Sequence, residues 1–317
     1  MGKKNTHVVA GAAGLIGYHL AEALLKRGDT VIGVDNFVTG SPQNIEDLRR
    51  FKRFRFMDHN IAQLLKIRGP VDFVFDFACP ASPVDFERLA TEIIQAGCFG
   101  VFNLLEFARQ KEAIFVFSSS SEVYGDPRPD EHPQRETYWG NVNCRGRRAV
   151  YDESKRYGET LLTVFHRTYG VETRTVRIFN TYGERMRSDD GRAIPTFIVQ
   201  ALRNEDITIF GNGTQTRSIQ HVSDLVRGVL LLAESDVREP INLGNPIEMS
   251  ILDLAQTIKR LTDSCSKIVF QRPLPENDPN IRRPDISRAG ELLGWKPLVS
   301  PEEGLKRIIN WFRRGVL

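Results

Sequence analysis

The sequence predicts an α/β fold in which a doubly wound parallel sheet is followed by a smaller C-terminal α/β lobe. Three observations predict this class: apolar runs alternate with amphipathic stretches, the runs are continuously apolar, and the pattern becomes irregular after about residue 183. Continuous apolar runs are typical of parallel strands that helices cover on both faces. We therefore expect a first domain at 1–183 and a substrate lobe mainly at 184–317, with some later segments returning to the first domain.

The elements of the first domain follow from these patterns. Strands are expected at short apolar runs, which lie at 6–12, 30–35, 54–61, 71–79, 113–120 and 173–179. Between them, apolar residues recur at helical spacing, most clearly at 15–27, 87–110 and 147–169. Because strands and helices alternate along the chain, the sequence predicts βαβ units and hence parallel pairing.

The elements of the second lobe are expected to be shorter. Its apolar runs lie at 207–210, 240–243 and 267–271, and its helix-period stretches lie at 192–203, 223–234, 250–262 and 301–313. The proline-rich segment 273–284 predicts an ordered loop.

Net charge and cysteine spacing exclude several classes of protein. The 317 residues include 43 Lys and Arg and 40 Asp and Glu, a formal charge of +3 that excludes a polyelectrolyte binder. The four cysteines lie far apart and predict neither a metal site nor a disulfide framework: Cys79, Cys98, Cys144 and Cys265. A signal-peptide pattern and a membrane-length apolar run are both missing. We expect a cytoplasmic protein without nucleic-acid or membrane partners.

A glycine-rich loop, Gly11–Gly17, joins the first expected strand to the first expected helix. Its three glycines allow a tight turn and a close approach to a pyrophosphate, and the helix N-terminus behind them presents free N–H groups. Asp35 ends the second strand, where a carboxylate can bind an adenosine ribose and would repel the 2′-phosphate of NADP. In this context the loop predicts a Rossmann-type NAD site; in isolation it would indicate only a strand–helix turn.

An acid–base pair is predicted on the helix at 147–169. Tyr151 and Lys155 are four residues apart and therefore lie on one face of that helix. A tyrosine pKa is about 10, and a nearby ammonium and an oxidised nicotinamide both favour the phenolate, so we expect the pKa of Tyr151 to fall towards neutrality. The serines at 118–121 end the strand at 113–120, where a hydroxyl can share the substrate proton with Tyr151.

Together these motifs resemble the extended short-chain dehydrogenases/reductases. Further segments resemble the UDP-glucuronate decarboxylases (UDP-xylose synthases) within that superfamily, and the match runs from about residue 6 to 313. These segments are Ala78–Pro83, Ser121–Pro127, His132–Gln134, Tyr138–Asn143, Arg177–Gly183, Asp190–Arg192, Gln215–Arg217 and Arg282–Ile286. The glycine loop and the Tyr–Lys pair are shared by the whole superfamily, whereas Cys-Pro-Ala-Ser-Pro and Tyr-Trp-Gly-Asn-Val-Asn are more specific.

The resemblance implies a closed redox cycle on UDP-glucuronate. NAD takes a hydride from C4 while Tyr151 takes the hydroxyl proton, the resulting β-keto acid loses carbon dioxide, and NADH reduces C4 again to give UDP-xylose. It also implies catalytic roles for Ser120, Ser121 and Glu122 beside Tyr151 and Lys155. Sugar 4,6-dehydratases carry an Asp-Glu pair here, and Ser121 in place of the Asp argues against that activity.

The resemblance also assigns the binding residues. The cofactor residues implied are Gly11, Gly14, Leu15, Ile16, Gly17, Asp35, Asn36, Thr39, Asn60, Ile61, Ala78, Tyr151 and Lys155. The substrate residues implied are Pro80, Asn180, Arg192, Arg217 and Arg282, and the choice between Arg282 and Arg283 is open. Positions that depart from the family pattern are Ala10, Asn60, Gly97, Cys144, Arg145 and Glu184, of which Gly97 replaces an Asn and is expected to alter support of the strand-end site.

Three other functions are compatible with the same motifs. A UDP-glucuronate 4-epimerase would keep the carboxylate and rotate the 4-keto sugar, and another decarboxylase would release a UDP-4-keto-pentose with NADH. A non-catalytic NAD-binding scaffold would need neither Tyr151 nor Lys155. Retention of Glu122 favours the decarboxylase over the epimerase.

The helices at 87–110 and 147–169 carry more apolar residues than one sheet-facing stripe requires. Among them are Phe99, Phe102, Leu105, Phe107, Leu161, Leu162, Val164 and Phe165. Relatives pair these helices as a four-helix interface, so we expect a homodimer; the alternative is that both helices are buried within one chain.

Overall fold

The computed structural model describes residues 4–271 and 282–315 and contains a seven-stranded parallel sheet. Its order is β11-β6-β5-β4-β1-β2-β3. The strands are β1 (Thr6–Ala10), β2 (Thr30–Asp35), β3 (Phe54–Asp58), β4 (Phe73–Asp76), β5 (Ile114–Ser120), β6 (Thr173–Ile178) and β11 (Ile241–Leu243). The chain adds β2 and β3 on one side of β1 and then β4, β5 and β6 on the other side. This change of side confirms the predicted doubly wound sheet.

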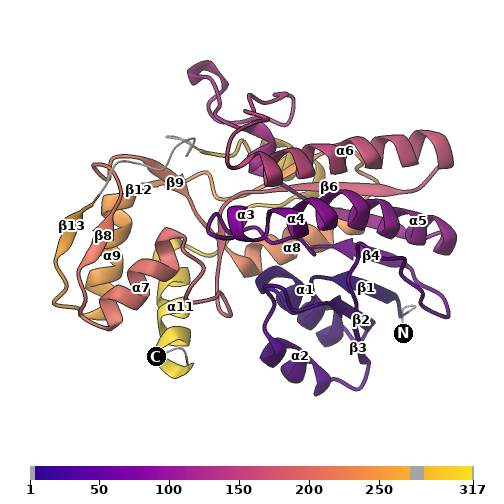
Figure 1. Cartoon of the computed structure of the whole chain (residues 1–317), viewed down its shortest axis with the longest axis horizontal. Coiled ribbons are helices and arrows are strands. Elements are labelled where there is room, and N and C mark those ends of the chain that lie inside the picture. Colours follow the sequence, from indigo (N-terminus) through magenta and orange to yellow (C-terminus); the bar gives the residue numbers. More distant parts are fainter. Residues whose placement is uncertain (1–3, 272–281, 316–317) are drawn as a thin grey trace.

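Helices cover both faces of this sheet, as Figure 1 shows. One layer holds α1 (Leu15–Lys26), α2 (Pro42–Arg49), α8 (Val222–Ala233) and α10 (Ser287–Leu293); the other holds α5 (Val101–Lys111) and α6 (Ala149–Tyr169). Val9 packs with the first layer and Val8 with the second, and both are fully buried. Successive strand residues point to opposite faces, so a strand covered on both faces is largely apolar.

The C-terminal lobe has its own apolar core. It packs α7 (Ala193–Leu202), α9 (Ile251–Thr262) and α11 (Pro301–Gly315) around residues such as Phe197, Ile258 and Ile308. Its strands form short pairs: β8 (Ile207–Ile209) with β13 (Ile268–Phe270), and β9 (Thr216–Ser218) with β12 (Glu248–Ser250). The pair of β7 (Thr181–Tyr182) and β10 (Gln220–His221) lies where the chain passes between the lobes.

The chain beyond residue 183 contributes to both cores. After α7 and β8 it returns to the sheet through α8, which packs on α1, and through β11, which pairs with β6. Trp295, just after α10, is buried in the same core as Tyr18 of α1. The sheet is therefore completed by residues distant in sequence from its first six strands.

The helices depart from the predicted pattern in three places. The helix expected at 87–110 is interrupted once: α3 (Asp85–Arg88) ends before Leu89, and α4 (Ala90–Ile94), a π-helical turn at Gln95–Gly100 and α5 then follow without a break. Leu89 interrupts it because its φ of −118° and ψ of 29° are not helical. The helices α2 and α10 were not predicted. Most of the proline-rich segment 273–284 lies outside the described residues, and no described helix is long and apolar enough to cross a membrane.

Candidate active site

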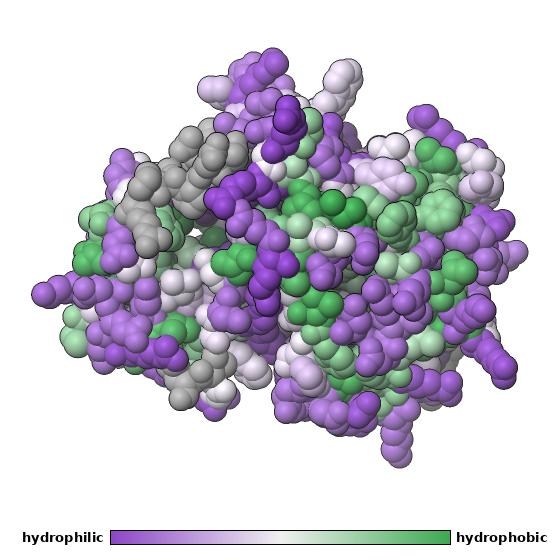
Figure 2. Space-filling view, in the orientation of Figure 1, coloured by the Kyte–Doolittle hydropathy of each residue, from purple (hydrophilic) through white to green (hydrophobic). Residues whose placement is uncertain are grey.

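A cavity of about 530 Å³ lies between the carboxyl edge of the sheet and the C-terminal lobe. Every residue that the sequence analysis assigned to cofactor, substrate or catalysis lines this one cavity. The carboxyl ends of parallel strands meet at one edge, so loops after β1, β2, β4 and β5 reach the same space. Figure 2 shows hydrophobic residues gathered between the two lobes, with hydrophilic residues around them.

The glycine loop forms a backbone cradle that side chains would fill. Gly11 has a φ of 79°, and a Cβ there would lie 2.4 Å from the Phe77 carbonyl oxygen. A Cβ on Gly17 would lie 2.0 Å from the carbonyl oxygen of Gly11, so the first turn of α1 packs directly on the loop. Gly14 caps α1 without a side-chain hydrogen bond, and the first turn contains no acidic residue. This cradle fits the pyrophosphate of a dinucleotide.

Asp35 ties the loop to the end of β2. Its carboxylate accepts hydrogen bonds from the backbone N–H groups of Ala13, at 2.9 Å, and Phe37, at 2.8 Å. Burial raises the pKa of Asp35, and these hydrogen bonds oppose the rise. At the same end of the cavity, the side-chain oxygen of Asn60 accepts from the N–H of Ala62. The carboxylate thus fixes the loop beside the position predicted for the adenosine ribose.

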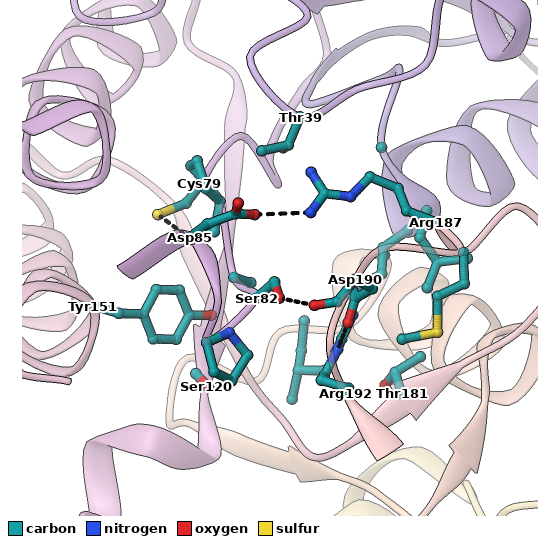
Figure 3. Close-up of a pocket in the computed structure, with 18 of the residues that line it drawn as sticks. Thr39, Cys79, Ser82, Asp85, Ser120, Tyr151, Thr181, Arg187, Asp190 and Arg192 are labelled. Carbon is teal, nitrogen blue, oxygen red and sulfur yellow. Dashed lines mark hydrogen bonds and ion pairs between the residues drawn. The ribbon is translucent and has the colours of Figure 1, made fainter. Parts of the chain in front are cut away.

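Tyr151 and Lys155 lie buried on one face of α6, as predicted. The Nζ atom of Lys155 is 5.5 Å from the centroid of the Tyr151 ring and donates to the Ser118 carbonyl oxygen at 2.7 Å. The Tyr151 ring stacks on Phe86 at 5.2 Å, and its hydroxyl points towards Ser120 (Figure 3). The strand end and the helix therefore present two hydroxyls and one ammonium to the same part of the cavity.

The groups of the protein alone raise the pKa of Tyr151. The expected fall towards neutrality also depends on the oxidised nicotinamide and stays a prediction. Burial raises the pKa of Tyr151, whereas Lys155 and a hydrogen bond with Ser120 lower it by less. Burial lowers the pKa of Lys155, but Tyr151, Cys79 and Asp76 raise it above its ordinary value, so the ammonium stays charged. The pattern in the sequence reveals the neighbouring charge, but it does not reveal how deeply both groups are buried.

Glu122 is held between two arginines. Its Oε2 is 2.8 Å from Nη2 of Arg148, and its Oε1 pairs with Nη1 of Arg282. Burial raises the pKa of Glu122, but the two guanidinium groups lower it to about 2. Arg282 is 3% exposed and also donates to the Gly125 carbonyl oxygen at 3.0 Å. Arg283 instead pairs with Glu248 and does not line the cavity, which favours Arg282 as the site residue.

Sequence reasoning missed Arg148. This residue caps the N-terminus of α6, lines the cavity and lies 5.5 Å from the centroid of the Phe86 ring that stacks on Tyr151. It therefore connects Glu122 to the ring that positions Tyr151. The available signal was the run Arg145–Arg148 directly before the helix.

One ion pair and one hydrogen bond join the segment after β4 to the C-terminal lobe, as Figure 3 shows. The buried Asp85 accepts from Arg187 at 3.1 Å, and Ser82 donates to the Asp190 carbonyl oxygen. Arg192 pairs with the Asp190 carboxylate at 2.5 Å and faces the cavity. Sequence reasoning missed Asp85 and Arg187, since their pairing depends on the approach of two distant loops.

Two predicted substrate residues carry polar groups suited to a ligand. The Nδ2 atom of Asn180 is buried and lacks a hydrogen-bond partner among residues 4–271 and 282–315, and it lines the cavity. Arg217 also lines the cavity and donates to the Thr216 carbonyl oxygen. Because buried polar atoms are normally paired, the Asn180 amide is available for a hydrogen bond with a bound molecule.

A Rossmann sheet with this loop, the Tyr–Lys pair and a strand-end serine defines an NAD-dependent enzyme of the extended short-chain dehydrogenase/reductase class. The chain belongs to the NAD dependent epimerase/dehydratase family, whose model matches residues 7–244. It is 46% identical over 310 residues to UDP-glucuronic acid decarboxylase 1 of Arabidopsis thaliana, covering 98% of this chain and 70% of that protein. It is 44% identical over 307 residues to UDP-glucuronic acid decarboxylase 1 of Danio rerio, covering 97% and 72%.

Solved structures of epimerases share the fold. A UDP-glucose 4-epimerase of Thermotoga maritima, solved with UDP-glucose, superposes with a TM-score of 0.89 at 28% identity, covering 98% of this chain and 100% of that one. A UDP-glucuronic acid 4-epimerase variant of Bacillus cereus, solved with a fluorinated UDP-glucuronic acid and NAD, gives 0.88 at 28%, covering 98% and 99%. The same fold therefore occurs in decarboxylases and epimerases, and the residues of the cavity must distinguish the reactions.

Proposed function

We propose that this chain is a UDP-glucuronate decarboxylase that forms UDP-xylose and carbon dioxide. The observation that carries the proposal is the ionised Glu122, held by Arg148 and Arg282 beside the Tyr151–Lys155–Ser120 group. It agrees with identities of 43–47% to the decarboxylases named UDP-glucuronic acid decarboxylase over nearly the whole chain.

The cradle of Gly11, Gly14 and Gly17, with Asp35 and Lys155, would hold NAD, the cofactor of this family. When bound, NAD supplies the hydride acceptor for C4 of the sugar and returns the hydride at the end of the cycle. Tyr151, beside Ser120, takes the proton of the C4 hydroxyl and later gives it back, and the Lys155 ammonium stabilises the phenolate in between.

The arginines provide the charge that the anionic substrate requires. Arg192 and Arg217 line the cavity on the side of the C-terminal lobe and would face the diphosphate. Oxidation at C4 makes the sugar a β-keto acid, so the electron pair of the C5–C6 bond is stabilised as an enolate when carbon dioxide leaves. The enolate then takes a proton at C5. Burial of Tyr151 and its stacking on Phe86 keep bulk water away from this step.

A 4-epimerase of UDP-glucuronate is the second candidate, because a protein of that name shares the fold. It would need the carboxylate to survive while the 4-keto sugar rotates. Glu122, fixed between two arginines beside the strand end, favours the decarboxylase. A non-catalytic scaffold is disfavoured, since Ser120, Tyr151 and Lys155 converge in one cavity.

An NMR time course with UDP-glucuronate and catalytic NAD+ tests the proposal. UDP-xylose and carbon dioxide without lasting NADH are the expected products. UDP-galacturonate with all carbon retained would instead show the epimerase, and a UDP-4-keto-pentose with stoichiometric NADH would show that the final reduction is missing.

The proposal extends to a homodimer formed through the α4–α5 segment and α6. Phe99 is 61% exposed and Phe102 47% exposed, and Tyr157 and Val164 of α6 are also exposed. Figure 2 shows hydrophobic residues on the surface over α5 and α6. A second copy of these two helices would cover the exposed apolar side chains. The cytoplasmic compartment stays a prediction from the sequence.

A further inference from the structure

The proposed decarboxylation consumes one proton that the cavity must supply. The C5–C6 bond breaks, carbon dioxide leaves, and the electron pair that stays on the sugar forms a new C5–H bond with this proton. The proton that Tyr151 takes from the C4 hydroxyl returns to the C4 oxygen, so it is not available to C5. Glu122 lines the cavity, but its pKa of about 2 leaves it without a proton near neutrality.

Asp152 is a second acid next to this site. It lies in the first turn of α6, directly after Tyr151, and is 6% exposed. Arg148 is four residues before it and therefore on the same face of the helix, and the same Arg148 is 2.8 Å from Glu122. The Oδ1 atom of Asp152 is buried without a hydrogen-bond partner among the described residues.

A buried carboxylate oxygen without a hydrogen-bond partner is costly in its ionised form, and holding a proton lowers that cost. Four charged groups act on Asp152: the carboxylates of Glu122 and Glu153 favour its protonated form, and Arg148 and Arg282 favour its ionised form. Burial is the largest influence and, together with Glu122, raises the pKa of Asp152 to about 7. Asp152 can therefore hold a proton at the pH where Glu122 cannot.

We propose that Asp152 stores the proton that C5 takes up and delivers it by way of Glu122. Asp152 does not line the cavity, whereas Glu122 does, so Asp152 acts through Glu122 as a positioning residue and proton store. In the step, the Asp152 O–H bond breaks, Glu122 receives that proton and passes it to C5, and Asp152 is left ionised until solvent protonates it again. The inference rests on the proposed function and extends it.

The test compares Asp152→Asn, which cannot supply a proton, with Asp152→Glu, which can. The control is Glu153→Gln, the neighbouring acid on the same helix, whose partly exposed side chain pairs with Arg156. For each variant, stopped-flow absorbance follows NADH formed from UDP-glucuronate, and NMR follows UDP-xylose over a range of pH.

With the wild type, UDP-xylose formation is expected to slow as the pH rises through about 7. In Asp152→Asn, NADH should form at the wild-type rate and accumulate, while UDP-xylose formation falls about 100-fold and loses this alkaline decline. Asp152→Glu should restore product formation with an alkaline decline at a shifted pH. Glu153→Gln should keep wild-type product formation and move the decline only slightly, because Glu153 is the weakest of the four charged influences on Asp152.

If Asp152→Asn forms UDP-xylose at the wild-type rate and with the wild-type pH profile, Asp152 is not the proton store. The proposed decarboxylase activity would be unaffected by that result. Wild-type protein that makes no UDP-xylose would overturn the proposed function itself. If thermal melting shows that Asp152→Asn does not fold, the pH profile of UDP-xylose formation by Asp152→Glu is the test. A shifted alkaline decline supports the role of Asp152 as proton store, and an unshifted decline contradicts it.

Discussion

Gly97 and Ser154 share one space between the π-helical turn and α6. A Cβ on Gly97 would lie 2.5 Å from the Cβ of Ser154, closer than two such atoms can approach. Ser154 directly precedes Lys155, and its hydroxyl donates to the Val150 carbonyl oxygen at 2.6 Å. Gly97 departs from the family pattern because it has no side chain. The side chain of Ser154 fills the space instead, so this part of α6 still packs against the π-helical turn.

This relationship predicts that Gly97→Asn is destabilising alone and tolerated with Ser154→Gly. The single change forces the turn and α6 apart and should lower the free energy of unfolding by about 1–3 kcal/mol. Ser154→Gly opens the space, so the double variant should recover most of the loss. Urea unfolding of the four proteins measures the coupling, and a Gly97→Asn protein as stable as the wild type would contradict the predicted clash.

The two neighbouring arginines should differ sharply. Arg282→Ala leaves the buried Glu122 with Arg148 as its remaining partner among those described above, and we expect a loss of about 3 kcal/mol in stability and a strong loss of turnover. Arg283→Ala removes a partly exposed pair with Glu248 and should cost less than about 1 kcal/mol. Urea unfolding and product formation measure both. Equal effects of the two substitutions would show that the buried pair of Arg282 with Glu122 contributes no more to stability and turnover than the partly exposed pair of Arg283 with Glu248.

Asp152 should also make stability depend on pH. Its folded pKa of about 7 lies above its ordinary value of 3.8, so the folded state binds more protons than the unfolded state between these values. The stabilisation that the folded protein gains from the protonated Asp152 is therefore complete below about pH 4 and is lost as the pH rises to about 7. Its upper limit is about 4 kcal/mol. Asp152→Asn should flatten this decline in a series of thermal melts. The idea fails if both proteins lose stability in parallel over that range.

The dimer predicts that a charge on the exposed face of α5 separates the subunits. Phe102→Glu should give a monomer in sedimentation velocity, because the glutamate would be buried against the second copy. Leu298→Glu is the matched control, since Leu298 is 65% exposed and contacts α8 on the other side of the sheet. A wild-type monomer at the same concentration would rule the interface out.

The sequence predicted the parallel sheet and the residues of the cavity for the same reason. A strand buried on both faces is largely apolar, and residues at the ends of parallel strands, such as Asp35 and Ser120, meet at one edge. The family resemblance added the residues of the later lobe. Helix α2 escaped prediction because it is short and buries only Asn44, Ile45 and Leu48.

The sequence alone could not predict the ion pairs between residues that are distant along the chain. The pair of Arg148 with Glu122 depends on how the loop after β5 meets the start of α6, and the pair of Asp85 with Arg187 depends on how the two lobes approach each other. No local sequence pattern encodes either distance. The break at Leu89 was missed because Phe86, Leu89 and Ile93 keep helical spacing across it. The pKa of Tyr151 depends on burial, which the four-residue spacing to Lys155 does not convey.

The pairing of β11 with β6 has a consequence for how the protein is made. A ribosome completes the first six strands by Ile178, yet the outer edge of β6 has no strand beside it until Ile241–Leu243 have been synthesised. Until then, a nascent chain presents unpaired backbone groups along β6 and the apolar surface of α1 that α8 later covers. Exposed edges of this kind promote association between chains. A chain shortened near residue 183 should therefore be prone to aggregation during its biosynthesis.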